Sequence, residues 1–362
     1  MNPVAENLYV HFPFCRRKCA YCALHSRVGV SSEARAEYVR RLADAVSSRL
    51  AAPSGGFSTV YFGGGSPALC DLQPLLAALS PRLGAACEFT VELHPLDVTD
   101  DLLLRLRDGG VNRISMGVQA LDDATLADMG RGYSLADAAR AFAAVRRRFA
   151  NAGIDLIVGY PKPGGGESAA QAMASARLGE WGLAHCSAYS LILEEKSLLG
   201  HRLRKDAALR EAMPSDDAVM DDLRGVSAAL AAMGLERYEI SNFAVRGREC
   251  RHNLAVWRGE DYIGLGEGAA GRLGLYRTRN WFGGSPETQD ETEKVDVAAD
   301  RKERTLFRLR TREGIDASGY PEWLPVLDRH VAGGLLVRGD SPAVYRLTER
   351  GSEVCDSILA DL

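Results

Sequence analysis

With 362 residues, 46% of them hydrophobic and 25% charged, the chain has an ordinary globular composition and is long enough for two domains or one large α/β barrel with an appendage. A formal net charge of −4 gives no general reason to bind nucleic acid, and no apolar run is long enough for a stable membrane span. Eight cysteines in a chain of this length do not make a small disulfide-stapled fold, and residues 1–7 are unlike a signal peptide, so we expect a cytoplasmic protein.

The first predicted strand, residues 8–11, leads directly into three cysteines with the spacing C-x3-C-x2-C: Cys15, Cys19 and Cys22. Three thiolates within eight residues can converge on one metal centre. Cubane iron–sulfur clusters usually take four thiolates, so a cluster held by three leaves one iron open to another ligand. This spacing therefore indicates chemistry at an open metal position.

Two simpler readings of the cysteines stay open on spacing alone. A pair of the thiols can form a disulfide. The three can also hold a structural zinc ion with His11 or His25 as the fourth ligand, because Cys3His is an established zinc set.

Short apolar runs and amphipathic stretches then alternate up to about residue 193. The periodicity predicts strands at residues 57–62, 89–93, 112–118, 153–158 and 186–193. It predicts helices at residues 33–50, 99–108 and 135–149, with Ser31 or Ser32 capping the first and Ser134 the last. Asp122 is expected to cap a further short helix that ends near Gly130. Six strands with helices between them imply a parallel sheet covered by helices, either doubly wound or a full or partial barrel.

Polar residues gather where these predicted strands end. They are the glycine run from Gly63 to Gly65, Glu92, Gln119 and Asp155. Ligands of parallel sheets collect at the carboxyl ends of the strands, so we expect one rim to carry all of them. For Glu92 and Asp155, structural salt bridges with Arg113 or Arg131 are the alternative to ligand binding.

From residue 236 the pattern changes, and we predict three parts: residues 1–235, an extension at 236–297 that closes the barrel, and a C-terminal helical or winged-helix-like module at 298–362. The extension contains His252, Asn253 and Trp257 within one short run. Histidine binds haem iron and aromatic rings stack on porphyrins, although a lone histidine is commonly structural.

In this order, the motifs of the chain resemble the radical S-adenosylmethionine (SAM) superfamily, specifically its branch of oxygen-independent coproporphyrinogen III oxidase-like proteins, and within it the HemW-type haem chaperones. The resemblance runs over nearly the whole chain, from Tyr9 to Ala269 in matched segments. It implies a partial (βα)6 barrel of the TIM type. It also implies an iron–sulfur, SAM-binding haem chaperone that hands haem to acceptor proteins.

For the site, the resemblance implies that Cys15, Cys19 and Cys22 hold a [4Fe–4S] cluster whose open iron takes SAM. The positions that match SAM contacts in the branch are Tyr9, Tyr21, Gly64, Gly65, Ser66, Glu92, Gln119, Arg131 and Asp155. It favours ligand binding over salt bridges for the two carboxylates. A low-potential electron donor is the implied partner of the cluster.

At several positions the residues differ from the motifs of the branch, and these differences distinguish a haem chaperone from a catalytic enzyme. Leu24 stands where the oxidases carry a further cysteine, and the run from His252 to Trp257 is a feature of the HemW type with Val256 in place of its tyrosine. Ala23 and Leu24 replace the usual Asp-Phe, and Ser66 replaces a threonine. We therefore expect haem bound at His252 and Trp257, with a catalytic radical enzyme, an oxidase or a methyltransferase, as the alternative.

Overall fold

The computed structural model describes residues 5–51, 53–162, 165–283 and 291–362, so residues 1–4 of the N-terminal segment 1–7 lie outside the described residues. The strands of its main sheet are β1 (Asn7–Phe12), β4 (Phe57–Gly64), β5 (Leu83–Leu93), β6 (Arg113–Gln119), β7 (Asn151–Val158), β8 (His185–Ser190), β9 (Glu236–Arg237), β10 (Asn242–Ala244), β11 (Tyr262–Leu265), β12 (Ala270–Leu273), β13 (Tyr276–Arg279) and β14 (Thr292–Lys294). Their spatial order is β14-β13-β12-β11-β1-β4-β5-β6-β7-β8-β10-β9. A separate short pair joins β2 (Phe14–Cys15) to β3 (Arg27–Val28).

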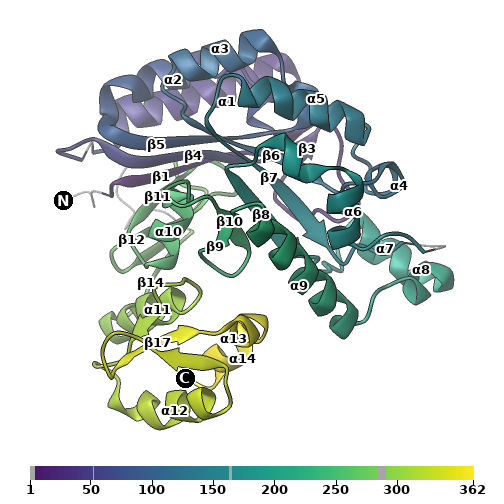
Figure 1. Cartoon of the computed structure of the whole chain (residues 1–362). Coiled ribbons are helices and arrows are strands. Elements are labelled where there is room, and N and C mark those ends of the chain that lie inside the picture. The colour runs from purple at the N-terminus through teal and green to yellow at the C-terminus, as the bar shows by residue number, and fades with distance from the viewer. Residues whose placement is uncertain (1–4, 52, 163–164, 284–290) are drawn as a thin grey trace.

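The α-helices in the described ranges are α1 (Ser32–Asp44), α2 (Gln73–Leu79), α3 (Asp100–Asp108), α4 (Asp123–Asp128), α5 (Leu135–Arg146), α6 (Ala169–Ser175), α7 (Leu198–Lys205), α8 (Ala207–Glu211), α9 (Asp216–Ala232), α10 (Arg251–Trp257), α11 (Val297–Arg308), α12 (Leu324–Ala332), α13 (Glu349–Glu353) and α14 (Cys355–Ala360). The predicted caps are confirmed, because Ser31, Asp122 and Ser134 each accept a hydrogen bond from a backbone N–H in the first turn of α1, α4 and α5. Figure 1 shows α1, α2, α3 and α5 covering one face of the sheet.

Strands β1, β4, β5, β6, β7 and β8 pair in parallel, each with the next, and β11 adds a seventh parallel strand beside β1. Helices connect the first six in sequence, as a parallel sheet requires. The other strands of the sheet run antiparallel at its two ends. The predicted α/β fold with a partial (βα)6 barrel is confirmed.

The parallel strands carry polar residues on one face only. In β6 the alternate residues that line the interior are Arg113, Ser115, Gly117 and Gln119. The residues between them belong to the main hydrophobic core: Ile114, Met116 and Val118. Because successive side chains of a strand point to opposite faces, this alternation gives the barrel an apolar outside under the helices and a polar inside. The inside is therefore available for a ligand.

The C-terminal residues form a smaller lobe, drawn in yellow in Figure 1. It contains α11 to α14 and a three-stranded antiparallel sheet of β15 (Ile315–Asp316), β17 (Val344–Leu347) and β16 (Leu336–Arg338). This lobe has a hydrophobic core of its own that includes Leu309, Trp323, Leu327 and Tyr345. The proposed divisions at residues 235 and 297 stay predictions. No helix in the described ranges is long and apolar enough to cross a lipid bilayer.

A cavity lined by the cysteine loop and the strand ends

A cavity of about 570 Å³ lies inside the barrel, at the carboxyl ends of the parallel strands. The sequence-predicted residues that line it are Cys15, Cys19, Tyr21, Cys22, Gly64, Gly65, Glu92, Gln119, Arg131 and Asp155. They come from the cysteine loop, the ends of β4, β5, β6 and β7, and the loop after α4. The fold therefore brings side chains that are up to 140 residues apart in the chain to one cavity, a separation that follows from Cys15 and Asp155.

The glycine run after β4 holds the cysteine loop against the barrel. The backbone N–H groups of Gly65 and Ser66 donate to the carbonyls of Phe12 and Phe14, both at 2.7 Å. A Cβ atom on Gly65 would lie 2.8 Å from the Phe12 carbonyl oxygen and 3.0 Å from the Cys15 sulfur. Only glycine allows this close approach, which fixes the position of Cys15 beside β4.

All three thiols are free of disulfides. The described ranges contain no group of three or more His, Cys, Asp or Glu side chains arranged around one metal ion, so the geometry offers no single zinc position. The nitrogens of His11 are engaged by the Tyr9 hydroxyl at 2.9 Å and the His25 carbonyl at 3.0 Å. A cubane cluster distributes its ligands over separate irons, so three thiols spaced around one cavity fit that donor set.

Arg131 lies directly against the cysteine loop. Its Nη1 is 3.1 Å from the Cys19 sulfur, its Nη2 donates to the Gly117 carbonyl at 2.7 Å, and its Nε donates to the Tyr133 hydroxyl at 3.0 Å. Arg131 is buried, so its positive charge is poorly screened by water. This buried positive charge complements the negative charge that thiolate ligands and their cluster carry.

Glu92 on β5 and Asp155 on β7 both line the cavity, from the two strands that flank β6. Glu92 accepts hydrogen bonds from the Tyr61 hydroxyl at 2.8 Å and the Gly64 N–H at 3.1 Å. Burial, and then repulsion from Asp155, raise the pKa of Glu92 to about 7. Among the described residues neither carboxylate forms an ion pair with Arg113 or Arg131, so the salt-bridge reading of these two residues finds no support in the geometry.

Sequence reasoning missed the residues that hold Asp155. Its Oδ1 accepts from the hydroxyls of Ser115 at 2.9 Å and Ser187 at 2.7 Å. Ser187 lies opposite Asp155 in register on β8, whereas Ser115 lies on β6 two residues before Gly117, the register partner of Asp155. The missed signal is the two-residue alternation of polar side chains within otherwise apolar strands, which marks the strand face that lines the cavity.

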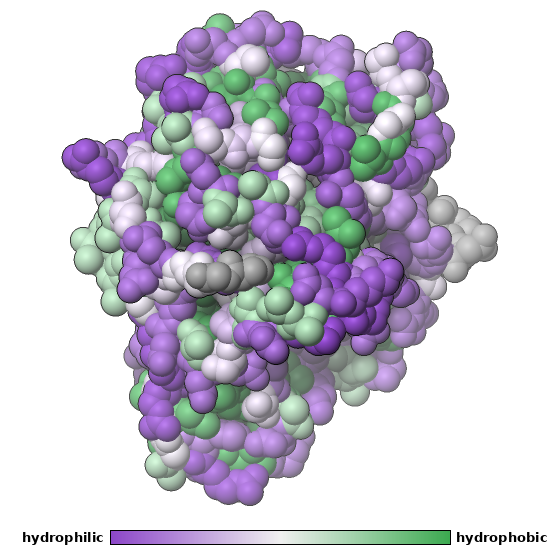
Figure 2. Space-filling model, turned by 90° about the vertical axis from the view of Figure 1, so that its right-hand side faces the viewer, coloured by the Kyte–Doolittle hydropathy of each residue, from purple (hydrophilic) through white to green (hydrophobic). Residues whose placement is uncertain are grey.

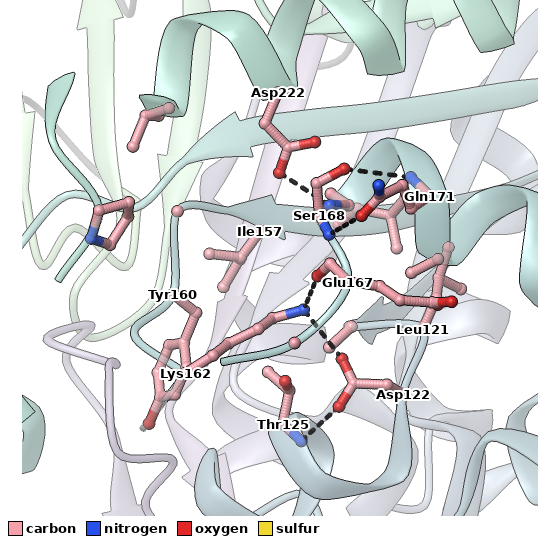
Figure 3. A pocket seen from close by; sticks show the side chains of 18 of the residues that line it. Leu121, Asp122, Thr125, Ile157, Tyr160, Lys162, Glu167, Ser168, Gln171 and Asp222 are labelled. Atoms are coloured by element: carbon pink, nitrogen blue, oxygen red, sulfur yellow. Dashed lines mark hydrogen bonds and ion pairs between the residues drawn. The ribbon is translucent and has the colours of Figure 1, made fainter. Parts of the chain in front are cut away.

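A second cavity of about 340 Å³ lies behind the same strand ends and shares Gln119 and Ile157 with the first. Figure 3 shows the Lys162 ammonium group pointing to the Asp122 carboxylate and the Glu167 carbonyl. The backbone of Gln119 has a φ of 75°, a left-handed conformation that is uncommon for residues other than glycine. Gln119 thus turns the chain at the wall between the two cavities.

Two further predicted residues lie beside the first cavity without lining it. The Tyr9 hydroxyl contacts His11 inside the barrel, as described above. Ser66 is buried, and its hydroxyl donates a short hydrogen bond to Asp97, which also pairs with Arg16 of the cysteine loop. In this structure Ser66 therefore supports the loop through Asp97.

His252 and Trp257 are not brought together. His252 is only 4% exposed, inside the barrel, where its Nδ1 lies 2.8 Å from the Thr59 hydroxyl and its ring packs on Tyr61 at 5.3 Å between centroids. Burial, and then the nearby Arg113, lower the pKa of His252 to about 3. Trp257, at the end of α10, lines a different cavity, between the barrel and the C-terminal lobe.

The chain resembles known proteins along nearly its whole length. The radical SAM superfamily matches residues 9–165. The heme chaperone HemW of Mycobacterium tuberculosis strain H37Rv is 31% identical, covering 98% of this chain and 94% of that protein. HemW of Escherichia coli K12 is also 31% identical, covering 98% and 97%.

Among solved structures, coproporphyrinogen III oxidase (HemN) of E. coli, a radical SAM enzyme, superposes with a TM-score of 0.79 at 20% identity, covering 99% of this chain and 89% of that one. This likeness shows a shared fold. Membership of the superfamily implies a [4Fe–4S] cluster and SAM, and the donor set of the cavity fits both. The chain belongs to the HemW family of the radical SAM superfamily.

Proposed function

We propose that this protein is a haem chaperone, which binds haem and delivers it to haem-acceptor proteins. The observation that carries the proposal is similarity to proteins named heme chaperone HemW over 98% of the chain, which includes the segment from His252 to Trp257. In this proposal the cavity beside the cysteines and the haem-binding segment from His252 to Trp257 belong to one protein. A low-potential electron donor is a further partner.

In this proposal Cys15, Cys19 and Cys22 hold the [4Fe–4S] cluster, and Arg131 stabilises its negative charge. When bound, the cluster supplies a single electron and an open iron position for SAM. The residues assigned to the surroundings of SAM are Tyr9, Tyr21, Gly64, Gly65, Ser66, Glu92, Gln119, Arg131 and Asp155. Glu92 and Asp155 offer carboxylate oxygens for hydroxyl or ammonium groups, and the glycines offer backbone N–H groups.

His252 is the proposed haem ligand and Trp257 the proposed aromatic partner. The buried ring of His252 reaches a haem iron only if α10 moves away from β4, which breaks the hydrogen bond with Thr59. Neutral imidazole is the form that binds iron, and the lowered pKa keeps His252 neutral at physiological pH. Loading of haem is therefore expected to be slow relative to diffusion.

Haem titration followed by absorbance tests the ligand. His252→Phe keeps a buried aromatic ring but removes the imidazole, whereas Thr59→Val removes the hydrogen-bond partner and keeps the imidazole. If His252 binds iron, the Phe variant loses the shifted haem absorption band and the Val variant keeps it. Equal binding by the wild type and His252→Phe would remove His252 as the ligand, and no binding by the wild type would remove the haem-chaperone proposal.

A catalytic radical enzyme is the second candidate, because a pure carrier has no evident use for Glu92, Gln119, Arg131 and Asp155 around one cavity. Anaerobic incubation with a reductant, SAM and coproporphyrinogen III separates the two functions. Formation of 5′-deoxyadenosine together with protoporphyrinogen supports an oxidase. Formation of 5′-deoxyadenosine without a porphyrin product points to another substrate, such as one that is methylated.

A further inference from the structure

A cavity of about 1080 Å³ separates the barrel from the C-terminal lobe. One side is formed by β8, β10, α9 and α10, and the other by the segment that contains α13 and α14. We call it the interlobe groove. In Figure 1 the C-terminal lobe lies apart from the barrel on this side of the sheet, and in Figure 2 the lobe forms the narrower lower part of the molecule. The groove is about twice as large as the cavity beside the cysteines.

One wall of the interlobe groove is apolar and large enough for a flat ring system. Its apolar side chains include Met220, Leu223, Val226, Val256 and Trp257, and Val354 faces the groove from the opposite side, between α13 and α14. Trp257 contributes an indole whose edge meets Phe307 at 6.0 Å between centroids. Such walls suit a planar hydrophobic ligand better than a polar one.

Three arginines of the groove are incompletely paired. Arg237 and Arg310 each have a buried Nε without a hydrogen-bond partner. Arg310 lies 4.9 Å from the centre of the Trp257 ring and pairs through Nη1 with Asp356, whose side chain is 86% exposed. Arg237 is 3.8 Å from the exposed carboxylate of Glu349. The exposed Arg350 makes no hydrogen bond or ion pair among the described residues.

The four acidic side chains that line the groove equal its arginines in number, but two of them are engaged elsewhere and two are exposed to solvent. Glu353 accepts hydrogen bonds from Nε and Nη2 of Arg224, each at 2.7 Å. Glu239 is buried against the Asn242 amide, and burial raises its pKa. The contacts from Asp356 and Glu349 are those of solvent-exposed side chains, which hold an arginine weakly. A carboxylate of a ligand can therefore replace them.

The groove also adjoins the cavity beside the cysteines. Tyr189, Ser190, Ile192 and Asn253 line both. Ile192 is 75% exposed, although it is a large apolar side chain. A flat ligand in the groove thus has one edge toward the barrel interior, on the side where α10 carries His252.

We propose that the interlobe groove is the haem-binding site, in which the apolar wall with Trp257 covers the porphyrin and Arg237, Arg310 and Arg350 bind its two propionates. This rests on the proposed haem function and specifies where and how the cargo is held. A porphyrin dicarboxylate combines a flat apolar body with two carboxylates at one edge, which is the combination that the groove presents. Arginine pairs with carboxylates through two parallel hydrogen bonds.

The test compares haem with haem dimethyl ester, in which both propionates are neutral. Arg310→Gln/Arg350→Gln removes two charges at side chains that are not in the core, and Arg346→Gln, which changes a half-buried arginine of the same lobe outside the groove, is the control. We expect the double variant to bind haem at least about tenfold more weakly, because it loses charge-assisted hydrogen bonds to the propionates, and to bind the ester as the wild type does.

The outcomes separate this inference from the proposed function. Wild-type protein that binds neither haem nor its ester would overturn both. Wild-type protein that binds haem and the ester with equal affinity, or a double variant with undiminished haem affinity, would overturn the groove assignment and leave a haem chaperone with its site elsewhere. Weakened haem binding by Arg346→Gln to the same extent would also overturn it, since the effect would then reflect the net charge of the lobe.

Discussion

The guanidinium group of Arg131 lies 3.1 Å from the sulfur of Cys19, and it is held there by the Gly117 carbonyl and the Tyr133 hydroxyl. A buried positive charge next to a cluster ligand stabilises the reduced cluster more than the oxidised one, because the reduced cluster carries one more negative charge. Hydrogen bonds to cluster sulfurs act in the same direction. Arg131 is thus expected to raise the reduction potential of the cluster.

Replacement of Arg131 by Gln is predicted to lower that potential. A difference of about 1.4 kcal/mol between the two oxidation states corresponds to about 59 mV for one electron. Arg131→Lys retains the charge and is expected to shift the potential less. A redox titration monitored by electron paramagnetic resonance measures both, and an unchanged potential in Arg131→Gln would show that the charge is screened from the cluster.

The glycine run gives a second prediction. Gly65→Ala places a methyl group 3.0 Å from the Cys15 sulfur and 2.8 Å from the Phe12 carbonyl, so the cysteine loop must move away from β4. We expect reconstituted protein to hold markedly less iron and sulfide per chain than the wild type. Overpacking of this kind typically costs about 1–3 kcal/mol.

Gly55→Ala is the matched control for this substitution, because a methyl group on Gly55 meets no atom within 4 Å. Its iron and sulfide content is expected to equal that of the wild type. If Gly65→Ala assembled a full cluster, the loop would have to be free to shift, and the close packing against β4 would not determine the position of Cys15.

The strands and the cysteine loop could be predicted from the sequence, because alternation and spacing are local properties. The side of α10 on which His252 lies could not be predicted in this way. Five residues along an α-helix correspond to a turn of about 140° beyond a full circle, so His252 and Trp257 on α10 face different sides. Sequence proximity suggested one cluster, whereas the start of α10 at Arg251 turns His252 inward to Thr59 and leaves Trp257 at the interlobe groove.

The interlobe groove could not be predicted from the sequence, because it forms between segments that are far apart in the chain. Arg237 and Arg310 are 73 residues apart, a separation that follows from their numbers, and only the docking of the C-terminal lobe brings them to one cavity. The run of arginines between residues 301 and 312 is a pattern typical of a solvated helix face and does not indicate a cavity. Contacts between lobes depend on packing that no local pattern encodes.

The raised pKa of Glu92 predicts how the stability of the cluster-free protein depends on pH. Folded Glu92 keeps its proton up to about pH 7, whereas the unfolded chain releases it near the ordinary value of 4.5. Between these values the folded state binds more protons, so the free energy of unfolding falls as the pH rises. At 1.36 kcal/mol per pKa unit the loss is about 3 kcal/mol.

Glu92→Gln removes this titration and is expected to flatten the decline between pH 5 and pH 7.5 in urea unfolding of the cluster-free protein. Glu37→Gln, at an exposed position of α1, serves as the control and should follow the wild type. Parallel curves for the wild type and Glu92→Gln would mean that water in the cavity stabilises the ionised carboxylate and that its pKa is ordinary.

The attachment of the C-terminal lobe gives the last prediction. Asp300 of α11 is 9% exposed and accepts hydrogen bonds from Arg277 and Arg304, both at 2.7 Å, with Arg272 at 3.3 Å. Asp300→Asn leaves these buried or half-buried guanidinium groups with one fewer carboxylate, and breaking a buried ion pair in this way costs about 3–5 kcal/mol.

The variant is therefore expected to unfold at clearly lower urea concentration than the wild type. Asp340→Asn removes a pair with Arg346 whose carboxylate is 90% exposed, and it should change the free energy of unfolding by less than about 1 kcal/mol. Because α11 joins β12 and β13 to the lobe that forms one wall of the groove, Asp300→Asn should also weaken haem binding. A variant as stable as the wild type would show that Glu303, which also pairs with Arg272 and Arg277, is sufficient to hold the lobe in place.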